Sequence, residues 1–228
     1  MNEKSTPSAA TTDPDELLEV FDAAGEPTGV AKTRAAIHAD GDWHLAFFCW
    51  IVRESNGGLG GVGEVEVVLQ RRAPHKDVWP GHFDASAAGH VRFGETLREA
   101  SREIEEELGL RVDPAQLEPL TRHRQEHVHE SGIVDREIHD VYVLRCDTPL
   151  EDYRPGPEVT GLVAVPVAHL VELACGTRPS LATTLVQHAP DGATSHEPIT
   201  LRRDDLVPYD VGYWEKIAHS GRASMARR

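Results

Sequence analysis

Hydrophobic positions in the first third of the chain form short runs that are separated by polar and glycine-rich segments, which predicts a series of β-strands. Trp43–Arg53 is almost continuously apolar, as expected for a central strand that is buried on both faces. Apolar and polar residues alternate in Glu64–Arg72, so we expect a second strand that pairs with the first. Leu17–Asp22 predicts a shorter strand before them, and the glycine-rich Asn56–Gly63 predicts the turn between the two long strands.

The second half of the chain contains one clear alternating run, Ile133–Cys146, which predicts a further strand. Asp135, Glu137 and His139 share one face of this strand because side chains alternate along it. Weaker patterns predict a strand at Val159–Val167, a short helix at about Val167–Ala174, and a hairpin or a helix near Tyr209–His219. Strands mixed with helices of this length indicate a three-layer or two-layer α/β sandwich built on a mixed sheet.

One amphipathic helix is predicted between Thr96 and Gly109. Thr96 is followed three residues later by a glutamate, as in a capping box, and Gly109 stands where a helix ends. The apolar positions fall on one stripe, namely Leu97, Ala100, Ile104 and Leu108. Glu103, Glu106 and Glu107 lie on the opposing arc, and carboxylates gathered in this way need a compensating charge. A divalent cation is the natural partner for them.

The length, net charge and cysteine content of the chain exclude several classes of protein. A chain of 228 residues with 39% hydrophobic content fits one large domain, or one domain with extensions. The formal net charge of −15 argues against a nucleic-acid-binding surface. The three cysteines have unrelated spacings and indicate reduced thiols, not a disulfide framework or a zinc site.

No segment predicts a membrane protein or a secreted one. No apolar run approaches the roughly 20 residues that a bilayer span requires. Residues 1–15 are rich in Ser, Thr, Pro and Ala and lack the apolar stretch of a signal peptide, so we expect a disordered tail. A soluble cytoplasmic protein without a membrane partner is the resulting expectation.

Gly89–Leu110 resembles the Nudix box, which reads Gly, five residues, Glu, a spacer, and then Arg-Glu-apolar-x-Glu-Glu-x-Gly-apolar. Gly89, Glu95 and all positions from Arg102 onwards match this pattern. The spacer Thr96–Ser101 has six residues, whereas the family usually has seven. The resemblance implies an α/β/α sandwich with a mixed β-sheet. It places a Nudix domain at residues 16–175, with residues 176–228 as a C-terminal extension packed on it.

A subgroup resemblance covers more of the chain. Four segments are similar to isopentenyl diphosphate isomerase and to the Nudix hydrolases related to it: Ala36–Trp50, Arg71–Gly81, Ser86–His90 and Ser131–Val141. The isomerases use a cysteine two residues before a metal-binding histidine, but here Ala88 precedes His90. Isomerases also usually lack an intact Glu-Glu pair in the Nudix helix, and this chain retains Glu106 and Glu107. Both departures favour a hydrolase.

The resemblance also implies which residues carry the chemistry. Mg²⁺ or Mn²⁺ would be held by Glu103, Glu106, Glu107 and the carbonyl of Gly89. The general base is left open among Glu106, Glu107 and Glu137. A second metal site, or a relic of one, would consist of His38, His44, His90, Asp135 and Glu137. Arg71, Arg72 and Lys76 would bind the substrate, and Glu95, Arg102 and Gly109 would be structural.

The expected reaction is attack of water on a diphosphate bond of a nucleoside diphosphate-linked or other organic diphosphate, assisted by the cation. The alternatives are an isomerase of isoprenoid diphosphates and a non-catalytic ligand-binding module. The partner is therefore a small molecule, while the oligomeric state is open, with a homodimer among the alternatives. Trp79 is expected in the core or in a pocket wall, and His123, His127 and His129 are interpreted as loop composition.

Overall fold

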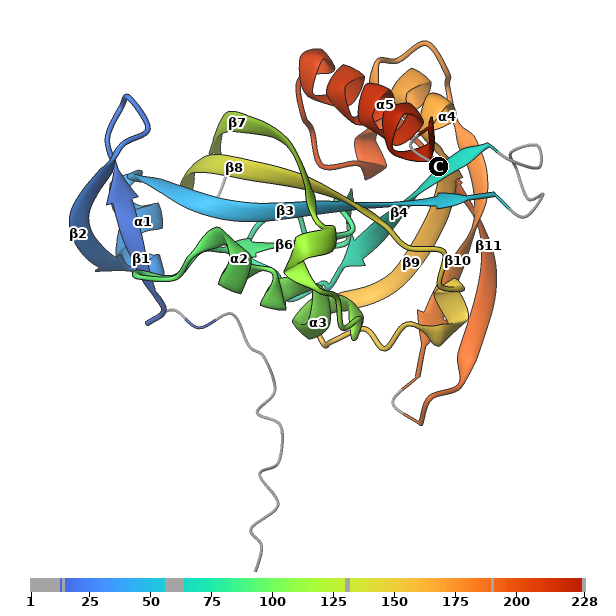
Figure 1. Cartoon of the computed structure of the whole chain (residues 1–228), viewed down its shortest axis with the longest axis horizontal. Coiled ribbons are helices and arrows are strands. Elements are labelled where there is room, and N and C mark those ends of the chain that lie inside the picture. The colour runs from blue at the N-terminus through green and yellow to red at the C-terminus, as the bar shows by residue number, and fades with distance from the viewer. Residues whose placement is uncertain (1–12, 14, 56–63, 130–131, 190, 227–228) are drawn as a thin grey trace, which may run out of the picture.

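The long strand β3 (Trp43–Glu54) lies at the centre of a large mixed sheet (Figure 1). The computed structural model describes residues 13, 15–55, 64–129, 132–189 and 191–226. The predicted Asn56–Gly63 turn and nearly all of the predicted N-terminal tail lie outside these residues. β3 runs antiparallel to β4 (Val65–Arg72) and β6 (Ala87–His90) and parallel to β8 (Val134–Arg145). The predicted central strand and its predicted partner are thus confirmed.

The sheet extends on both sides of β3, in the order β11-β10-β9-β4-β3-β1-β2, and further strands branch from this path. β8 pairs with β3 and with β7, β6 with β3, and β5 with β4. The remaining strands are β1 (Leu17–Phe21), β2 (Pro27–Thr33), β5 (Phe83–Asp84), β7 (Glu118–Val128), β9 (Val159–Pro166), β10 (Leu181–His188) and β11 (Thr194–Leu201). The sequence pattern did not predict β2 or β7.

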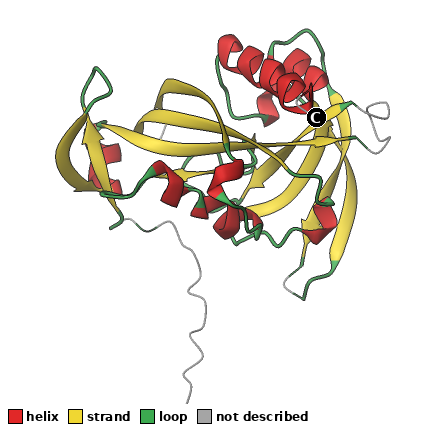
Figure 2. Cartoon of the chain, in the orientation of Figure 1, coloured by secondary structure: helices red, strands yellow, loops and turns green. Residues whose placement is uncertain are grey.

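Side chains of β3 point alternately into two cores, one on each face of the sheet. Phe48 and Trp50 pack in the core beneath α4 (Val167–Ala174) and α5 (Val211–Ala226). Phe47 and Ile51 pack in the opposite core, against α2 (Leu97–Ala100) and α3 (Arg102–Leu108). Helices therefore cover both faces (Figure 2), in agreement with the predicted three-layer α/β sandwich. None of the helices in the described residues combines the length and the apolarity needed to cross a bilayer.

The helix that the sequence predicts as one continuous element is interrupted at Ser101. Ser101 has φ −62° and ψ −9°, and its hydroxyl donates to the carbonyl of Arg98 at 2.7 Å. The predicted capping box is present at Thr96, and Gly109 ends α3 with φ 68°. The interruption falls in the spacer that is one residue short, and Ala100 and Ile104 on either side of it are both fully buried. The prediction of a single helix was therefore wrong.

The C-terminal residues contain both of the alternatives that the weak pattern left open. β10 and β11 form an antiparallel hairpin, and α5 follows it. Leu185, Leu201 and Trp214 belong to the same core as Trp50 of β3. The remaining short elements are α1 (Arg34–Asp40) and three 3-10 turns, Pro114–Gln116, Leu150–Asp152 and Arg203–Asp205.

Candidate active site

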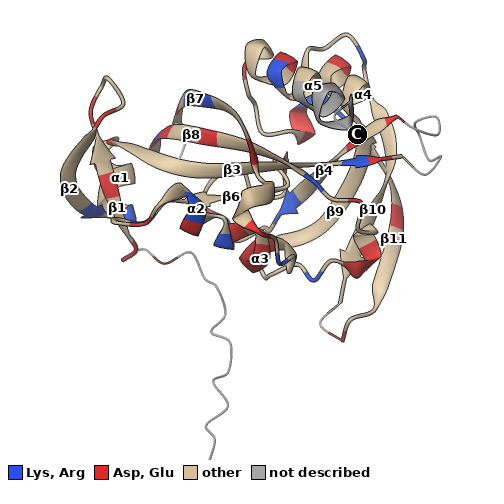
Figure 3. Cartoon of the chain, viewed as in Figure 1, with Lys and Arg blue, Asp and Glu red and all other residues tan. Residues whose placement is uncertain are grey.

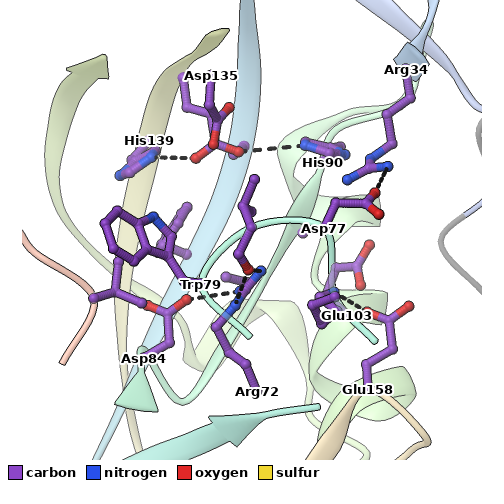
Figure 4. A pocket seen from close by; sticks show the side chains of 18 of the residues that line it. Arg34, Arg72, Asp77, Trp79, Asp84, His90, Glu103, Asp135, His139 and Glu158 are labelled. Atoms are coloured by element: carbon purple, nitrogen blue, oxygen red, sulfur yellow. Dashed lines mark hydrogen bonds and ion pairs between the residues drawn. The ribbon is translucent and has the colours of Figure 1, made fainter. Parts of the chain in front are cut away.

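A charged pocket with a volume of about 230 Å³ lies where α1, α3, β6 and β8 meet (Figure 4). Charged and ionisable side chains from all of these elements line it: Arg34, His38, Arg72, Lys76, His90, Glu103, Glu106, Asp135, Glu137 and His139. Acidic positions are concentrated on α3 (Figure 3). The pocket therefore brings together residues that are about 100 positions apart in the sequence, such as His38 of α1 and Asp135 of β8.

The carboxylates of α3 differ in their environments. Burial is the main cause that raises the pKa of Glu103 to about 8. The charge of Glu107 adds to this shift, and Arg102 opposes it. Burial likewise raises the pKa of Glu107 to about 7. Glu106 is 44% exposed and lines the pocket. Buried carboxylates whose charged forms are disfavoured are a donor set that suits a hard divalent cation.

Glu107 is held by two hydrogen bonds that leave one of its oxygens without a partner. Its Oε2 accepts from Gln70 Nε2 at 2.7 Å and from the backbone N–H of Ala88 at 2.8 Å. Its Oε1 is buried and has no hydrogen-bond partner among the described residues. Oε1 is therefore suited to bind a cation, because a buried oxygen that has no partner is energetically unfavourable.

Gly89 allows Glu103 to approach the strand. A Cβ atom at Gly89 would lie 2.2 Å from Cδ of Glu103, a distance at which the glutamate would have to move. The glycine therefore sets the position of the Glu103 carboxylate.

Arg102 joins the helix to the loop before it, despite the short spacer. Its Nε donates to Glu95 Oε1 at 2.8 Å, and its Nη2 donates to the His90 carbonyl at 3.3 Å. Its Nη1 donates to Glu106 Oε2 at 3.1 Å and also to Glu103. Because α3 begins at Arg102, the guanidinium reaches all of these acceptors at once.

Three histidines and two carboxylates form a second group in the same pocket. The ring centroids of His38, His44 and His90 lie 5.0–5.6 Å apart. Asp135 Oδ1 is 3.8 Å from Nε2 of His38 and of His44, and Glu137 Oε1 is 3.4 Å from His90 Nε2. His44, Asp135 and Glu137 offer ligand atoms that all lie within 4.8 Å of one another, as do the three histidines. These distances are suited to a metal ion between the side chains.

The protonation of two of the histidines also suits a metal site, whereas at His90 the effect of burial, which lowers the pKa, is outweighed by hydrogen bonds to Glu137 and Glu16 that raise it to about 9. Burial lowers the pKa of His38 to about 4 and that of His44 to about 3, so both imidazoles are neutral at pH 7. Burial and, to a smaller extent, the charge of Glu137 together raise the pKa of Asp135 to about 7. Nε2 of His38, Nε2 of His44 and Oδ1 of Asp135 are buried and have no hydrogen-bond partners in the described part of the chain. Neutral imidazole nitrogens and carboxylates are ligands that transition metals accept.

The pocket also contains basic side chains with different partners. Lys76 forms an ion pair with Glu158, and Arg34 Nη1 donates to Asp77 Oδ2 at 2.8 Å. Arg72 Nη1 donates to Asp84 Oδ2 at 3.0 Å, while its Nε and Nη2 donate to the Val78 carbonyl at 3.2 and 3.1 Å. Arg71, its neighbour on β4, is not among the residues that line the pocket. All three basic side chains line the pocket, and Arg72 also holds the loop after β4 through the Val78 carbonyl.

Arg34 and Tyr209 line the pocket and were not predicted from the sequence. Arg34 is 7% exposed and begins α1, one helical turn before His38. That spacing is the sequence signal that could have identified it. Tyr209 comes from the C-terminal segment and donates a hydrogen bond to Asp84. No local pattern connects it to the pocket.

Comparison with known proteins identifies relatives of this chain. The family model described as the NUDIX domain matches residues 42–183. An uncharacterized Nudix hydrolase of Clostridium acetobutylicum is 29% identical over 204 residues, which cover 89% of this chain and 95% of that protein. An isopentenyl-diphosphate Delta-isomerase of Paenarthrobacter aurescens is 38% identical over 57% of this chain, and the match spans 66% of its own length. A crystal structure of a Deinococcus radiodurans protein shares the fold, with a TM-score of 0.53, 24% identity, and coverage of 71% of this chain and 90% of that one.

Proposed function

Since this chain belongs to the Nudix family, we propose that it hydrolyses a diphosphate bond of a nucleoside diphosphate-linked or other organic diphosphate, with Mg²⁺ or Mn²⁺ as cofactor. The observation that carries the proposal is the intact set of α3 carboxylates: Glu103 lies against Gly89, and Glu103 and Glu106 line the same pocket as the basic side chains. Cytoplasmic location is part of this proposal.

Glu103, Glu106, Glu107 and the Gly89 carbonyl would hold the cation. When bound, it supplies positive charge to the phosphate oxygens and makes water a stronger acid. Arg34 and Lys76 line the same pocket and would bind the diphosphate, because cationic side chains form charge-assisted hydrogen bonds with phosphate. Arg72 supports the loop that carries Lys76.

We propose Glu106 as the general base. The sequence alone does not distinguish it from Glu107 and Glu137. It lines the pocket and is 44% exposed, so one side of its carboxylate reaches solvent. Glu107 is held by Gln70 and Ala88. Burial opposes ionisation of Glu137, but hydrogen bonds from His139 and His90 hold its pKa well below the usual range. A carboxylate with a low pKa is a weak base.

The histidine–carboxylate group favours a second candidate function, isomerisation of an isoprenoid diphosphate. Ala88 argues against the isomerase. It lies on β6, where it pairs with Phe48 of β3. Its side chain is a methyl group at the position where the isomerases have a reactive thiol. Among the described residues, no cysteine lines the pocket. The remaining alternative is a non-catalytic module, against which the intact carboxylates argue.

A substrate panel tests the proposed reaction. Nucleoside diphosphate-linked compounds, free nucleotides, thiamine diphosphate and isopentenyl diphosphate are incubated with Mg²⁺ or Mn²⁺, and the release of phosphomonoesters or of inorganic phosphate is measured by chromatography. We expect release from at least one compound and none when EDTA removes the cation. No release from any compound would contradict the hydrolase, and deuterium uptake from D₂O into isopentenyl diphosphate would favour the isomerase.

Replacement of Gly89 tests whether the position of Glu103 matters for the reaction. We expect Gly89→Ala to lower metal-dependent hydrolysis at least about tenfold, because metal charge is a major part of catalysis. The unfolding free energy of the cation-free protein should change by less than about 1.5 kcal/mol, because the group displaced is the end of a flexible side chain. Steady-state kinetics and urea denaturation measure the two quantities. Full activity of the variant would show that the Glu103 position is not required.

A further inference from the structure

Gln70 is a polar residue on the buried strand β4. Residues 67–69, which precede it, are fully buried, and Gln70 itself is 1% exposed. Because side chains alternate along a strand, Gln70 lies on the same face as Val68, which packs in the core against α2 and α3. A buried amide is unfavourable unless it forms hydrogen bonds. The Gln70 side chain therefore needs a partner on the α3 side of the sheet.

Glu107 of α3 is this partner. Gln70 Nε2 donates to Glu107 Oε2 at 2.7 Å, and the backbone N–H of Ala88 donates to the same oxygen at 2.8 Å. Oε1 is left buried without a hydrogen-bond partner among the described residues. Because the two donors come from different strands, β4 and β6, they hold the carboxylate in one orientation.

Both donors to Glu107 are uncharged. An amide and a backbone N–H stabilise an ionised carboxylate, but they do not neutralise it. Lys76, the charge of which also acts on Glu107, forms its ion pair with Glu158 instead. A lysine or an arginine at position 70 would supply the compensating charge itself. With glutamine there, the negative charge of Glu107 stays available to a bound cation.

We propose that Gln70 is a positioning residue for the cation site: its amide fixes the Glu107 carboxylate, with Oε1 free to bind the cation. This inference rests on the proposed function, because it assumes a cation at the α3 carboxylates, but it requires no particular substrate. Groups that hydrogen-bond a metal ligand set the orientation of that ligand. Gln70 lies outside the Nudix box, so the spacing within the box does not reveal it.

The cation affinity of Gln70→Met tests this role. Methionine resembles glutamine in length but has no N–H to donate. Binding of Mg²⁺, which prefers oxygen ligands to histidines, is measured by isothermal titration calorimetry without substrate. We expect the dissociation constant to rise at least about tenfold, since loss of a group that orients a metal ligand weakens binding by about 10–100-fold. The matched control is Leu69→Met, a buried position on the same strand that packs in the opposite core. Its dissociation constant should stay within about twofold of the original value, because the exchange conserves volume.

A double-mutant cycle distinguishes positioning of Glu107 from a general packing role. Gln70→Met is combined with Glu107→Gln, and Mg²⁺ affinity is measured in all four proteins. If Gln70 acts through the Glu107 carboxylate, Gln70→Met should change the affinity of Glu107→Gln by less than about twofold. An equal loss in both backgrounds would overturn the inference, and so would an unchanged affinity in Gln70→Met alone.

A measurement on the original protein covers the case in which Gln70→Met does not fold. The side-chain amide signals of the glutamines are followed by NMR while Mg²⁺ is added. We expect the Gln70 signal to shift with the dissociation constant found by calorimetry. The signal of Gln116, which is exposed on a 3-10 turn, should not move. Binding of Mg²⁺ without a shift at Gln70 would overturn the inference, as would the absence of Mg²⁺ binding.

These binding experiments separate failure of this inference from failure of the proposed reaction, because they need no turnover. Weaker Mg²⁺ binding in Gln70→Met, lost in the Glu107→Gln background, supports the role of Gln70 even if no compound is hydrolysed. If Gln70→Met hydrolyses a diphosphate with the original Mg²⁺ affinity, the reaction stands and the role of Gln70 is wrong.

Discussion

Glu106→Gln and Glu107→Gln are each expected to lower kcat/KM for the diphosphate substrate at least about tenfold while the fold survives, because the cation's charge carries much of the catalysis. Each change removes one negative charge from the proposed cation ligands and leaves the size of the side chain almost unchanged. In Glu107→Gln the amide oxygen can still accept the N–H of Ala88, which the carboxylate accepts at 2.8 Å. Steady-state formation of the phosphorylated products measures the activity, and circular dichroism measures the fold.

Glu105→Gln is the matched control for these two variants. Glu105 lies on the same helix, its side chain is 52% exposed, and it pairs with the exposed Arg111. Because exposed ion pairs contribute little, we expect activity within about twofold of the original protein. Full activity in both Glu106→Gln and Glu107→Gln would show that the cation is held elsewhere, and the histidine–carboxylate group would then be the first place to look.

Trp214→Ala is expected to lower the unfolding free energy by about 3–5 kcal/mol, the usual loss when a large buried aromatic is truncated. Trp214 is 3% exposed and lies 5.5 Å, centroid to centroid, from Trp50 of the central strand. It also lies 5.5 Å from Tyr209, which reaches the charged pocket. The truncation therefore removes contacts that join α5 to the sheet. Urea denaturation monitored by circular dichroism gives the free energy.

Val211→Ala on the same helix is the control for this truncation. Val211 is 50% exposed, so its replacement should change the unfolding free energy by less than about 0.5 kcal/mol. A loss of under 1 kcal/mol in Trp214→Ala would mean that α5 packs only loosely on the sheet. In that case the wall formed by Tyr209 would not depend on α5.

Strands with a strong pattern of apolar residues were predicted well, because the strands that are buried in the core carry apolar side chains. The apolar run Trp43–Arg53 and the alternating Glu64–Arg72 correspond to β3 and β4 within one residue at each end. β7 was missed because it alternates half-buried and exposed polar residues, which resemble a loop. The break at Ser101 was missed because a helical pattern continues on both sides of it. Only the surrounding packing decides such an interruption.

Site residues inside the Nudix box could be predicted because their spacing is local. Glu103, Glu106 and Glu107 share a helix, so the sequence alone places them on one arc. The pairing of Arg102 with Glu95 depended on where α3 begins, which the six-residue spacer left open. Arg34 was missed because the resemblance used for prediction began two residues later. Among the basic residues, alternation along β4 keeps Arg71 out of the pocket that Arg72 lines.

By itself the sequence determined the central strands and the acidic helix and, through the Nudix box, predicted the cation ligands, because these depend on residues that are close along the chain. Tertiary structure decided everything that requires distant segments to meet. It brought His38, His90 and Asp135 from α1, β6 and β8 into one group, since the parallel pairing of β3 with β8 sets which residues lie opposite one another. It also placed Tyr209 in the pocket wall, and no local periodicity could have shown that.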